Sequence, residues 1–229
     1  MDSAAWERLW RELDKIRTYG RQLDIQTALA AAREANVDLS LDDLHLLIQK
    51  MPRLVHQSLP ICPPAIARFV SDYLKGAKVD SILDPQADSL LLASLAVATT
   101  VADVRGYIRS HDALALANAL YIGQTISWHH ANFLHTSMQS SEQFDVVASC
   151  LSFGMKPMNA SFSSPEGEVN VRDNEEYILL LKSCLHLKPH GVAFFVVFNG
   201  FFFCSRFKQC IQCPSTIRFV CRCCHERAQ

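Results

Sequence analysis

The stretch Phe144-Asp-Val-Val-Ala-Ser-Cys-Leu-Ser-Phe-Gly154 decides how the rest of the chain is interpreted. Its first six residues are mostly small or apolar and include two adjacent valines, a composition typical of a strand buried within a sheet. The four residues that follow are Cys150, Leu151, Ser152 and Phe153, and the glycine after them permits a sharp change of direction. The stretch therefore predicts a buried strand that ends in a tight turn.

Outward from this strand, short apolar segments alternate with helical patterns of about ten residues. Strands are expected at residues 79–83, 101–108, 125–133, 144–149 and 192–198. Helices are expected at residues 65–74, 89–98, 112–120 and 175–187. This alternation predicts βαβ units, a parallel sheet covered by helices on both faces, and right-handed crossovers. Residues 157–173 are expected to form a polar loop, and Lys188-Pro-His-Gly191 a turn into the last strand.

The first part of the chain has a helical pattern. In the first helix the apolar residues recur at three- and four-residue steps, namely Trp6, Leu9, Trp10, Leu13 and Ile16. Further helices are expected at residues 24–35 and 40–51, with Ser40 and Asp43 capping the start of the latter and Pro52 closing it. These helices form either a bundle that packs on the main domain or an arm dedicated to a partner. The chain thus divides into a helical N-terminal region (1–57), an α/β domain (58–203) and a C-terminal tail (204–229).

The composition limits what the chain can bind. Hydrophobic residues make up 49% of its 229 residues, which is enough for a large core and excludes an intrinsically disordered chain. With 22 basic and 23 acidic residues the net charge is −1, so no strong basic field is available to hold a phosphate backbone. A nucleic-acid substrate would therefore require a partner protein. No signal peptide is visible, and no apolar run approaches the roughly 20 residues of a membrane span, so we expect a soluble, cytoplasmic protein without a membrane partner.

Several short motifs follow one another along the chain, namely Cys62-Pro-Pro-Ala-Ile-Ala-Arg-Phe69, Ile82-Leu-Asp-Pro85, Val104-Arg-Gly106, Ala113-Leu-Ala-Leu-Ala117, Phe144-Asp-Val-Val147 with Phe153-Gly154, and Leu187-Lys-Pro-His-Gly191 with Phe195-Val-Val-Phe-Asn-Gly-Phe201. Their order and spacing resemble those of the adenine-specific DNA methyltransferases of type I restriction–modification systems. The resemblance covers about residues 60–203, roughly two-thirds of the chain. It implies a Rossmann-like class I methyltransferase domain, with the sheet order reversing near the first strand. It also implies S-adenosylmethionine as cofactor, DNA as substrate and partner subunits.

The cofactor positions implied by this resemblance hold unusual residues. The family pattern after the first strand is Asp-Pro-Ala-Cys-Gly-Ser-Gly, whereas this chain has Asp84-Pro-Gln-Ala-Asp-Ser-Leu90, without either glycine. If the turn keeps positive φ angles there, Asp88 and Leu90 each destabilise it by about 1 kcal/mol. Ile108 stands at the position of the acid that binds the ribose hydroxyl groups, and it cannot accept a hydrogen bond. By position, the cofactor-binding residues are Pro63, Asp84, Ala87, Asp88, Ser89, Ile108 and Asn132.

Among these positions, Asn132 departs least from what cofactor binding in the family requires. In the family an acid at this position binds the adenine amino group of the cofactor. The side-chain oxygen of Asn132 can still accept a hydrogen bond from that amino group. The contact with the cofactor's adenine amino group is therefore expected to remain possible at this position.

The catalytic turn is substituted as well. The family motif Asn-Pro-Pro-Phe holds the adenine amino group during methyl transfer, and its aromatic ring stacks on the flipped base. Cys150, Leu151, Ser152 and Phe153 take these positions, so only the aromatic residue is retained. Cys150 is then either a catalytic thiolate or a buried cysteine, and Phe153 is either a base-stacking ring or part of the core.

Two functional hypotheses follow from this pattern. The first is methyl transfer from S-adenosylmethionine to the amino group of adenine in DNA, within a multisubunit complex. The second is a degenerate, non-enzymatic subunit or scaffold of a restriction–modification-like complex, which binds a partner through its helical region. The loss of cofactor and catalytic contacts in a retained frame favours the second hypothesis.

The tail contains a candidate metal site. Six of the nine cysteines lie within residues 204–229, and Cys210, Cys213, Cys221 and Cys224 have a spacing that resembles zinc ligands. The second pair belongs to an irregular group, and no long segment separates the two pairs. These features favour a cysteine-rich strand at residues 215–223 with reactive thiols near the terminus over a zinc site. Because no secretory signal is visible, a disulfide framework is not expected.

Overall fold

The computed structural model describes residues 2–18, 25–40, 42–43, 46–47, 62–92, 95, 101–121, 126–139, 141–152, 156–164 and 167–197. Of residues 216–221 it describes the backbone alone. All structural statements below concern these residues.

The centre of the molecule is a six-stranded sheet with the strand order β3-β2-β1-β4-β7-β8. Every neighbouring pair is parallel, which confirms the expected parallel sheet. The order reverses beside β1, and in sheets of this kind ligands bind at the carboxyl ends of the strands next to the reversal. The strands are β1 (Ser81–Asp84), β2 (Asp103–Ile108), β3 (Ile126–His130), β4 (Phe144–Cys150), β7 (Leu187–Val197) and β8 (Thr216–Cys221).

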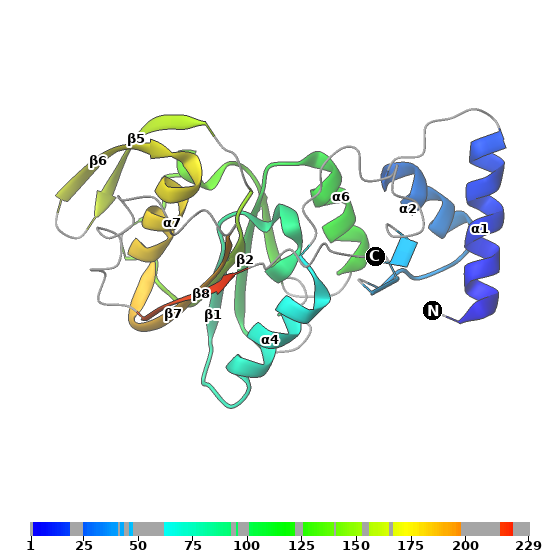
Figure 1. Ribbon diagram of the computed structural model, residues 1–229, viewed down its shortest axis with the longest axis horizontal. Coiled ribbons are helices and arrows are strands. Elements are labelled where there is room, and N and C mark those ends of the chain that lie inside the picture. Colours follow the sequence, from blue (N-terminus) through cyan, green and yellow to red (C-terminus); the bar gives the residue numbers. More distant parts are fainter. Residues whose placement is uncertain are drawn as a thin grey trace, which may run out of the picture.

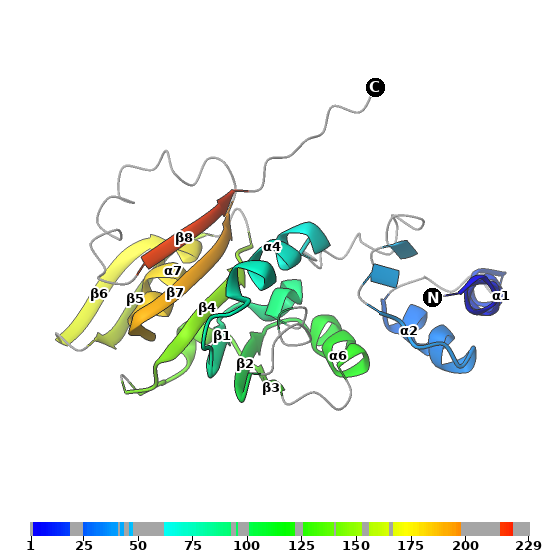
Figure 2. The ribbon, with the colours of Figure 1, turned by 90° about the horizontal axis from the view of Figure 1, so that it is seen from below.

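Helices cover both faces of the sheet, as Figure 2 shows. α4 (Pro64–Leu74) and α6 (His111–Leu120) lie on one face, and α7 (Glu175–Leu185) lies on the other. Residues 91, 92 and 95 are also helical, within the segment where a helix was expected. Because successive strand residues point to opposite faces, Phe194 joins the apolar cluster under α4 while Phe195 joins the cluster under α7. Helices on both faces explain why the central strands β1 and β4 are buried along almost their whole length.

β4 is the strand predicted from the opening stretch, and it lies between β1 and β7. Six of its seven residues are buried. The strand extends one residue beyond the predicted end, to Cys150. Cys150 itself is 3% exposed. The prediction of a buried strand is therefore confirmed, whereas Gly154 of the predicted turn lies outside the described residues.

The N-terminal helices are α1 (Ser3–Thr18) and α2 (Ile25–Glu34), which lie at one end of the molecule beside α6 (Figure 1). Most of their buried apolar residues form a cluster separate from those of the sheet, whereas Leu29 of α2 joins the cluster of α6. Further along, Asp43 N donates to Ser40 Oγ at 3.1 Å and Ser40 N donates to Asp43 Oδ2 at 3.1 Å, which confirms the predicted cap. Most of the helix predicted at residues 40–51 lies outside the described residues.

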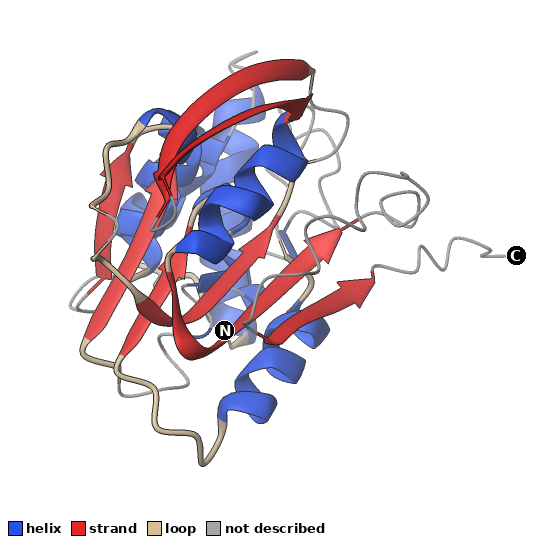
Figure 3. Cartoon of the chain, turned by 90° about the vertical axis from the view of Figure 1, so that its left-hand side faces the viewer, coloured by secondary structure: helices blue, strands red, loops and turns tan. Residues whose placement is uncertain are grey.

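The segment expected to be a polar loop is instead a β-hairpin. β5 (Pro157–Ser164) and β6 (Gly167–Asn174) pair in antiparallel fashion over their whole length (Figure 3). The loop prediction was wrong because the polar residues are only half of the pattern. Apolar side chains alternate with them and pack against the α7 cluster, namely Met158, Ala160, Phe162, Val169 and Val171.

The turn expected at residues 188–191 is also wrong, because β7 begins at Leu187 and includes these residues. α7 ends at Leu185, so the change of direction occurs at His186. Lys188 is held in the strand by Asp145, since Lys188 Nζ lies 2.9 Å from both carboxylate oxygens. The same carboxylate accepts hydrogen bonds from Ser81 N and Ser81 Oγ, which ties the amino ends of β1, β4 and β7 together.

Candidate functional site

The candidate site lies where the carboxyl ends of β1, β2 and β4 meet. Asp84 is the last residue of β1, Ile108 the last of β2 and Cys150 the last of β4. These positions match the expectation from the sequence. Ile108 is fully buried in an apolar cluster with Leu90 and Leu116, so it is part of the core rather than a lining residue.

Asp84 is fully buried beneath this edge of the sheet. Its Oδ1 accepts hydrogen bonds from Ser149 Oγ at 2.7 Å and from Gln86 N at 3.0 Å, while Oδ2 takes part in neither bond. Burial raises the pKa of Asp84 to about 7, and the nearby negative charge of Asp88 acts in the same direction. The carboxyl group therefore holds the β1 turn and the end of β4 in place from below the site.

The turn after β1 keeps a glycine-like backbone without a glycine. Ala87–Ser89 form a short 3₁₀ helix, η2, and Leu90 follows it with φ 56° and ψ 21°, in the left-handed region. Its side chain is fully buried. The expected positive φ is therefore found at Leu90 but not at Asp88, because Asp88 lies within the 3₁₀ helix. Burial of the Leu90 side chain offsets the strain of its backbone.

Asp88 turns its carboxylate toward the backbone that follows β2. Its Oδ1 accepts hydrogen bonds from Arg109 N at 3.0 Å and from Ser110 N at 2.9 Å. Ser110 is the N-cap of α6, so Asp88 fixes the start of that helix. The carboxylate thus occupies the place at which a glycine would leave backbone open to a ligand.

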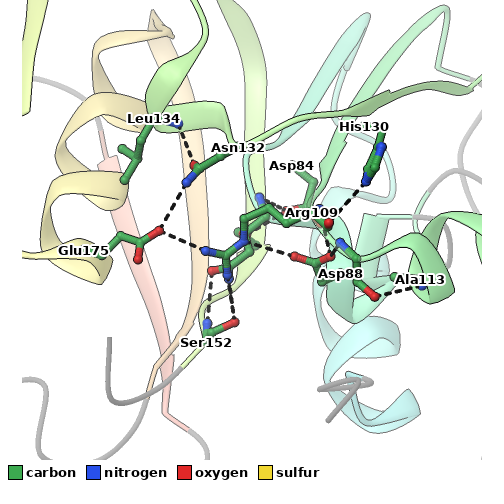
Figure 4. Close-up of polar contacts among 12 residues, drawn as sticks. Asp84, Asp88, Arg109, Ala113, His130, Asn132, Leu134, Ser152 and Glu175 are labelled. Carbon is green, nitrogen blue, oxygen red and sulfur yellow. Dashed lines mark hydrogen bonds and ion pairs between the residues drawn. The ribbon is translucent and has the colours of Figure 1, made fainter. Parts of the chain in front are cut away.

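Arg109 extends its guanidinium across the site, as Figure 4 shows. Its Nη1 lies 2.9 Å from Glu175 Oε1, its Nε lies 3.5 Å from Asp88 Oδ2, and its Nη2 lies 3.5 Å from Ser152 Oγ. Glu175 is the first residue of α7, where its negative charge also suits the helix terminus. A single side chain therefore links the turns that follow β1 and β4 to the helix on the far side.

The turn after β4 is held by backbone N–H groups. Leu151 N donates to Val196 O at 3.1 Å, and Ser152 N donates to Gln86 Oε1 at 3.0 Å. Gln86 Nε2 donates in return to Ser152 Oγ at 2.5 Å, which closes a two-bond link between the β1 and β4 turns. Both N–H groups belong to positions that are proline in the family motif, so this turn is stabilised by bonds that the motif cannot make. Phe153 lies outside the described residues.

Asn132 does not have the free oxygen that the sequence suggested. Its Oδ1 accepts a hydrogen bond from Leu134 N at 3.0 Å and so caps the short helix η3 (Phe133–His135). Its Nδ2 lies 3.5 Å from Glu175 Oε1. Asn132 thus belongs to the same polar network as Arg109, and within that network its oxygen is already engaged.

The structure brings together some of the predicted site residues and excludes others. Asp84, Asp88, Asn132 and Ser152 meet at the carboxyl edge of the sheet. Ala87 and Ser89 are buried beneath the turn, and Pro63 is the N-cap of α4. Sequence reasoning missed the roles of Arg109, Gln86 and Glu175. The signal in the sequence was the position of Arg109, a basic residue directly after Ile108. Asp88 and Glu175 are acids with which it could pair.

Of the four candidate zinc ligands, the structure describes the backbone of one. Cys221 is the last residue of β8, whereas Cys210, Cys213 and Cys224 lie outside the described residues. Among the residues that the structure describes, no three or more His, Cys, Asp or Glu side chains gather as a metal site. None of the described helices is both long and apolar enough to cross a membrane.

Comparisons with known proteins support the fold assignment. The sequence matches no known family model and no curated protein. Among solved structures, it is similar to a proposed class I S-adenosylmethionine-dependent methyltransferase from Listeria monocytogenes, with a TM-score of 0.61 and 17% identity over 91% of this chain and 78% of that one. The protein therefore has a Rossmann-like class I methyltransferase fold, as predicted.

Two weaker matches are of the same kind. The plantazolicin methyltransferase BpumL, solved with a desmethylPZN analogue and S-adenosylhomocysteine, has a TM-score of 0.42 and 17% identity over 66% of this chain and 51% of that one. A methyltransferase from Agrobacterium tumefaciens, dependent on S-adenosylmethionine, has a TM-score of 0.40 and 12% identity over 57% of this chain and 43% of that one.

Proposed function

We propose that this chain is a catalytically degenerate member of the methyltransferase lineage, derived from the adenine-specific DNA methyltransferases, and that it acts as a non-enzymatic subunit. The observation that carries the proposal is the position of Arg109. Its guanidinium bridges Asp88, Ser152 and Glu175 across the carboxyl ends of β1, β2 and β4. This is the crevice in which doubly wound sheets bind their ligands.

The cofactor half of the crevice supports loss of S-adenosylmethionine binding. The carboxylate of Asp88 stands where the family brings backbone close to the methionine part of the cofactor, and it would repel the cofactor's own carboxylate. Ile108 is buried and offers nothing to the ribose hydroxyl groups. Each lost polar contact weakens binding by roughly 1–3 kcal/mol, so together these losses reduce affinity by orders of magnitude.

The catalytic half supports the same conclusion. Methyl transfer in the family needs an amide and a carbonyl at the turn to hold the adenine amino group. Cys150 is buried and lacks an amide, and Ser152 is bonded through both its N–H and its hydroxyl group to Gln86. The groups at this turn thus stabilise the fold and are not directed toward a substrate.

The N-terminal helices supply a candidate surface for a partner subunit. α1 and α2 share an apolar cluster, and α2 packs on α6 at the end of the molecule opposite the β5–β6 hairpin (Figure 1). Trp6 and Trp10 stack on α1 with their ring centroids 6.0 Å apart, and both are partly exposed. Partly exposed tryptophans are enriched at protein interfaces. With a net charge of −1, contact with DNA would depend on such a partner.

A methyl-transfer assay tests the proposal. The purified chain is incubated with tritiated S-adenosylmethionine and unmethylated DNA, with a working adenine methyltransferase as the positive control. We expect no tritium in the DNA above the level without protein. Incorporation that rises with the concentration of this chain would establish an enzyme and overturn the proposal.

A further inference from the structure

The β5–β6 hairpin forms a sheet of its own, apart from the central one. Its pairs run from Pro157 opposite Asn174 to Ser164 opposite Gly167. In the described part of the chain no third strand pairs with either outer edge. A hairpin of this length therefore presents two rows of backbone N–H and C=O groups, and such edges pair readily with another strand unless something prevents it.

The two edges differ in how well they are protected. β6 has the sequence Gly-Glu-Val-Asn-Val-Arg-Asp-Asn and carries charges at Glu168, Arg172 and Asp173. β5 has the sequence Pro-Met-Asn-Ala-Ser-Phe-Ser-Ser and carries no charge at all over its eight residues. Charged side chains on an edge strand oppose pairing because they must be desolvated. β5 is therefore the less protected edge, because only Pro157 at its start opposes pairing, whereas β6 carries three charges.

The side chains of β5 are self-complementary. Met158, Ala160 and Phe162 face the α7 cluster, while Asn159 and Ser161 on the other face are exposed. In an antiparallel pair, residues directly opposite each other lie on the same face. A two-fold axis at Ala160 therefore places Met158 opposite Phe162 of the partner subunit, and Asn159 opposite Ser161 of the partner subunit. This register matches apolar with apolar and polar with polar residues.

We propose that two copies of this chain associate through β5 and form a continuous four-stranded antiparallel sheet in the order β6-β5-β5-β6. The interface is isologous, so one pairing satisfies both β5 edges. The outer edges of the combined sheet are the charged β6 strands, so association stops at a dimer. The hairpin lies at the end of the molecule opposite α1 and α2, which leaves those helices clear of the interface (Figure 1). This inference does not depend on the absence of methyl transfer.

Sedimentation velocity of the full chain from about 1 to about 100 µM provides the test. Two variants place one lysine on the same exposed face at directly opposed positions, Ser161→Lys on β5 and Asn170→Lys on β6. Lysine at 161 retains a partner within the chain, because the Ser161 hydroxyl already contacts Glu168. We expect a monomer–dimer equilibrium whose dissociation constant rises at least about tenfold in Ser161→Lys and changes less than about threefold in Asn170→Lys.

Hydrogen exchange on the unmodified chain gives a second readout that needs no variant. Amides of residues 158–164 should exchange more slowly as the concentration rises, whereas those of residues 167–174 should not respond. A monomer over the whole concentration range would overturn the proposal. So would a dimer that is insensitive to Ser161→Lys and shows no added protection in β5, because its interface would lie elsewhere.

Discussion

Among single residues, Asp84 bears the strongest electrostatic constraint in the site. It is fully buried, and its nearest donors are the Ser149 hydroxyl and the Gln86 amide. Desolvation is the main reason that its pKa lies near 7 instead of its usual value of 3.8. At neutral pH the carboxyl group is therefore only partly ionised, which makes the stability of the whole sheet edge sensitive to pH.

The first prediction concerns this sensitivity. Between about pH 4 and pH 7 the folded chain keeps the Asp84 proton that the unfolded chain releases, so the free energy of unfolding falls as pH rises through this window. The fall amounts to at most about 4 kcal/mol. Urea unfolding at a series of pH values measures it.

Asp84→Asn is the matched variant for that measurement. It removes the titrating group while keeping a similar shape, so the decline of stability between about pH 4 and pH 7 should flatten. An equal decline in the variant and in the natural chain would assign the effect to another group and contradict the account of Asp84.

Among the elements, the segment after β4 depends on backbone N–H groups for its position. Leu151 and Ser152 use their N–H groups to bind Val196 and Gln86. Proline has no N–H group, so the family motif would break both bonds here. The segment is therefore stabilised by two bonds that prolines at these positions would remove.

The second prediction follows from those bonds. The triple variant Cys150→Asn, Leu151→Pro, Ser152→Pro introduces the Asn-Pro-Pro-Phe sequence of the family motif. We expect its free energy of unfolding to be lower than that of the natural chain by about 2–4 kcal/mol, because Val196 O and Gln86 Oε1 lose their N–H donors. It should also fail to methylate DNA, because the cofactor turn is unchanged. Thermal unfolding and tritiated methyl transfer measure the two effects. A variant as stable as the natural chain, or one that gains activity, would contradict this interpretation.

The third prediction concerns the junction between η3 and α7. Lys182 is 4% exposed, and its Nζ donates to Phe133 O at 2.7 Å, Leu134 O at 3.2 Å and Thr136 O at 2.8 Å. Lys182→Met keeps most of the side-chain volume but removes the donor shared by three carbonyl groups. We expect a loss of about 2–4 kcal/mol in the free energy of unfolding, measured with urea.

The control for that measurement is an exposed lysine. Lys78→Met makes the same chemical change on the surface and should alter stability by less than about 0.5 kcal/mol. Equal effects of the two substitutions would mean that the bonds of Lys182 do not hold the junction together.

For the molecule as a whole, the alternation of apolar segments with helical patterns was sufficient to predict the parallel sheet, and the resemblance to methyltransferases added the reversal beside β1. The central strand was predicted to within one residue, because it ends at Cys150 and not at Ser149. The hairpin was missed because the polar residues of β5 and β6 hid an alternation of period two. The network around Arg109 was missed for a different reason. Its members come from the segments that follow β1, β2 and β4 and from the start of α7, and only the fold brings side chains so distant in sequence into contact.

The central claim is that the ligand crevice of this methyltransferase fold is closed by its own side chains. Calorimetric titration of the folded, full-length chain with S-adenosylmethionine tests it most directly. The account predicts no binding tighter than about 100 µM, because Asp88 and Ile108 remove cofactor contacts and Arg109 crosses the crevice. A dissociation constant of about 1–10 µM at a stoichiometry near one would contradict it.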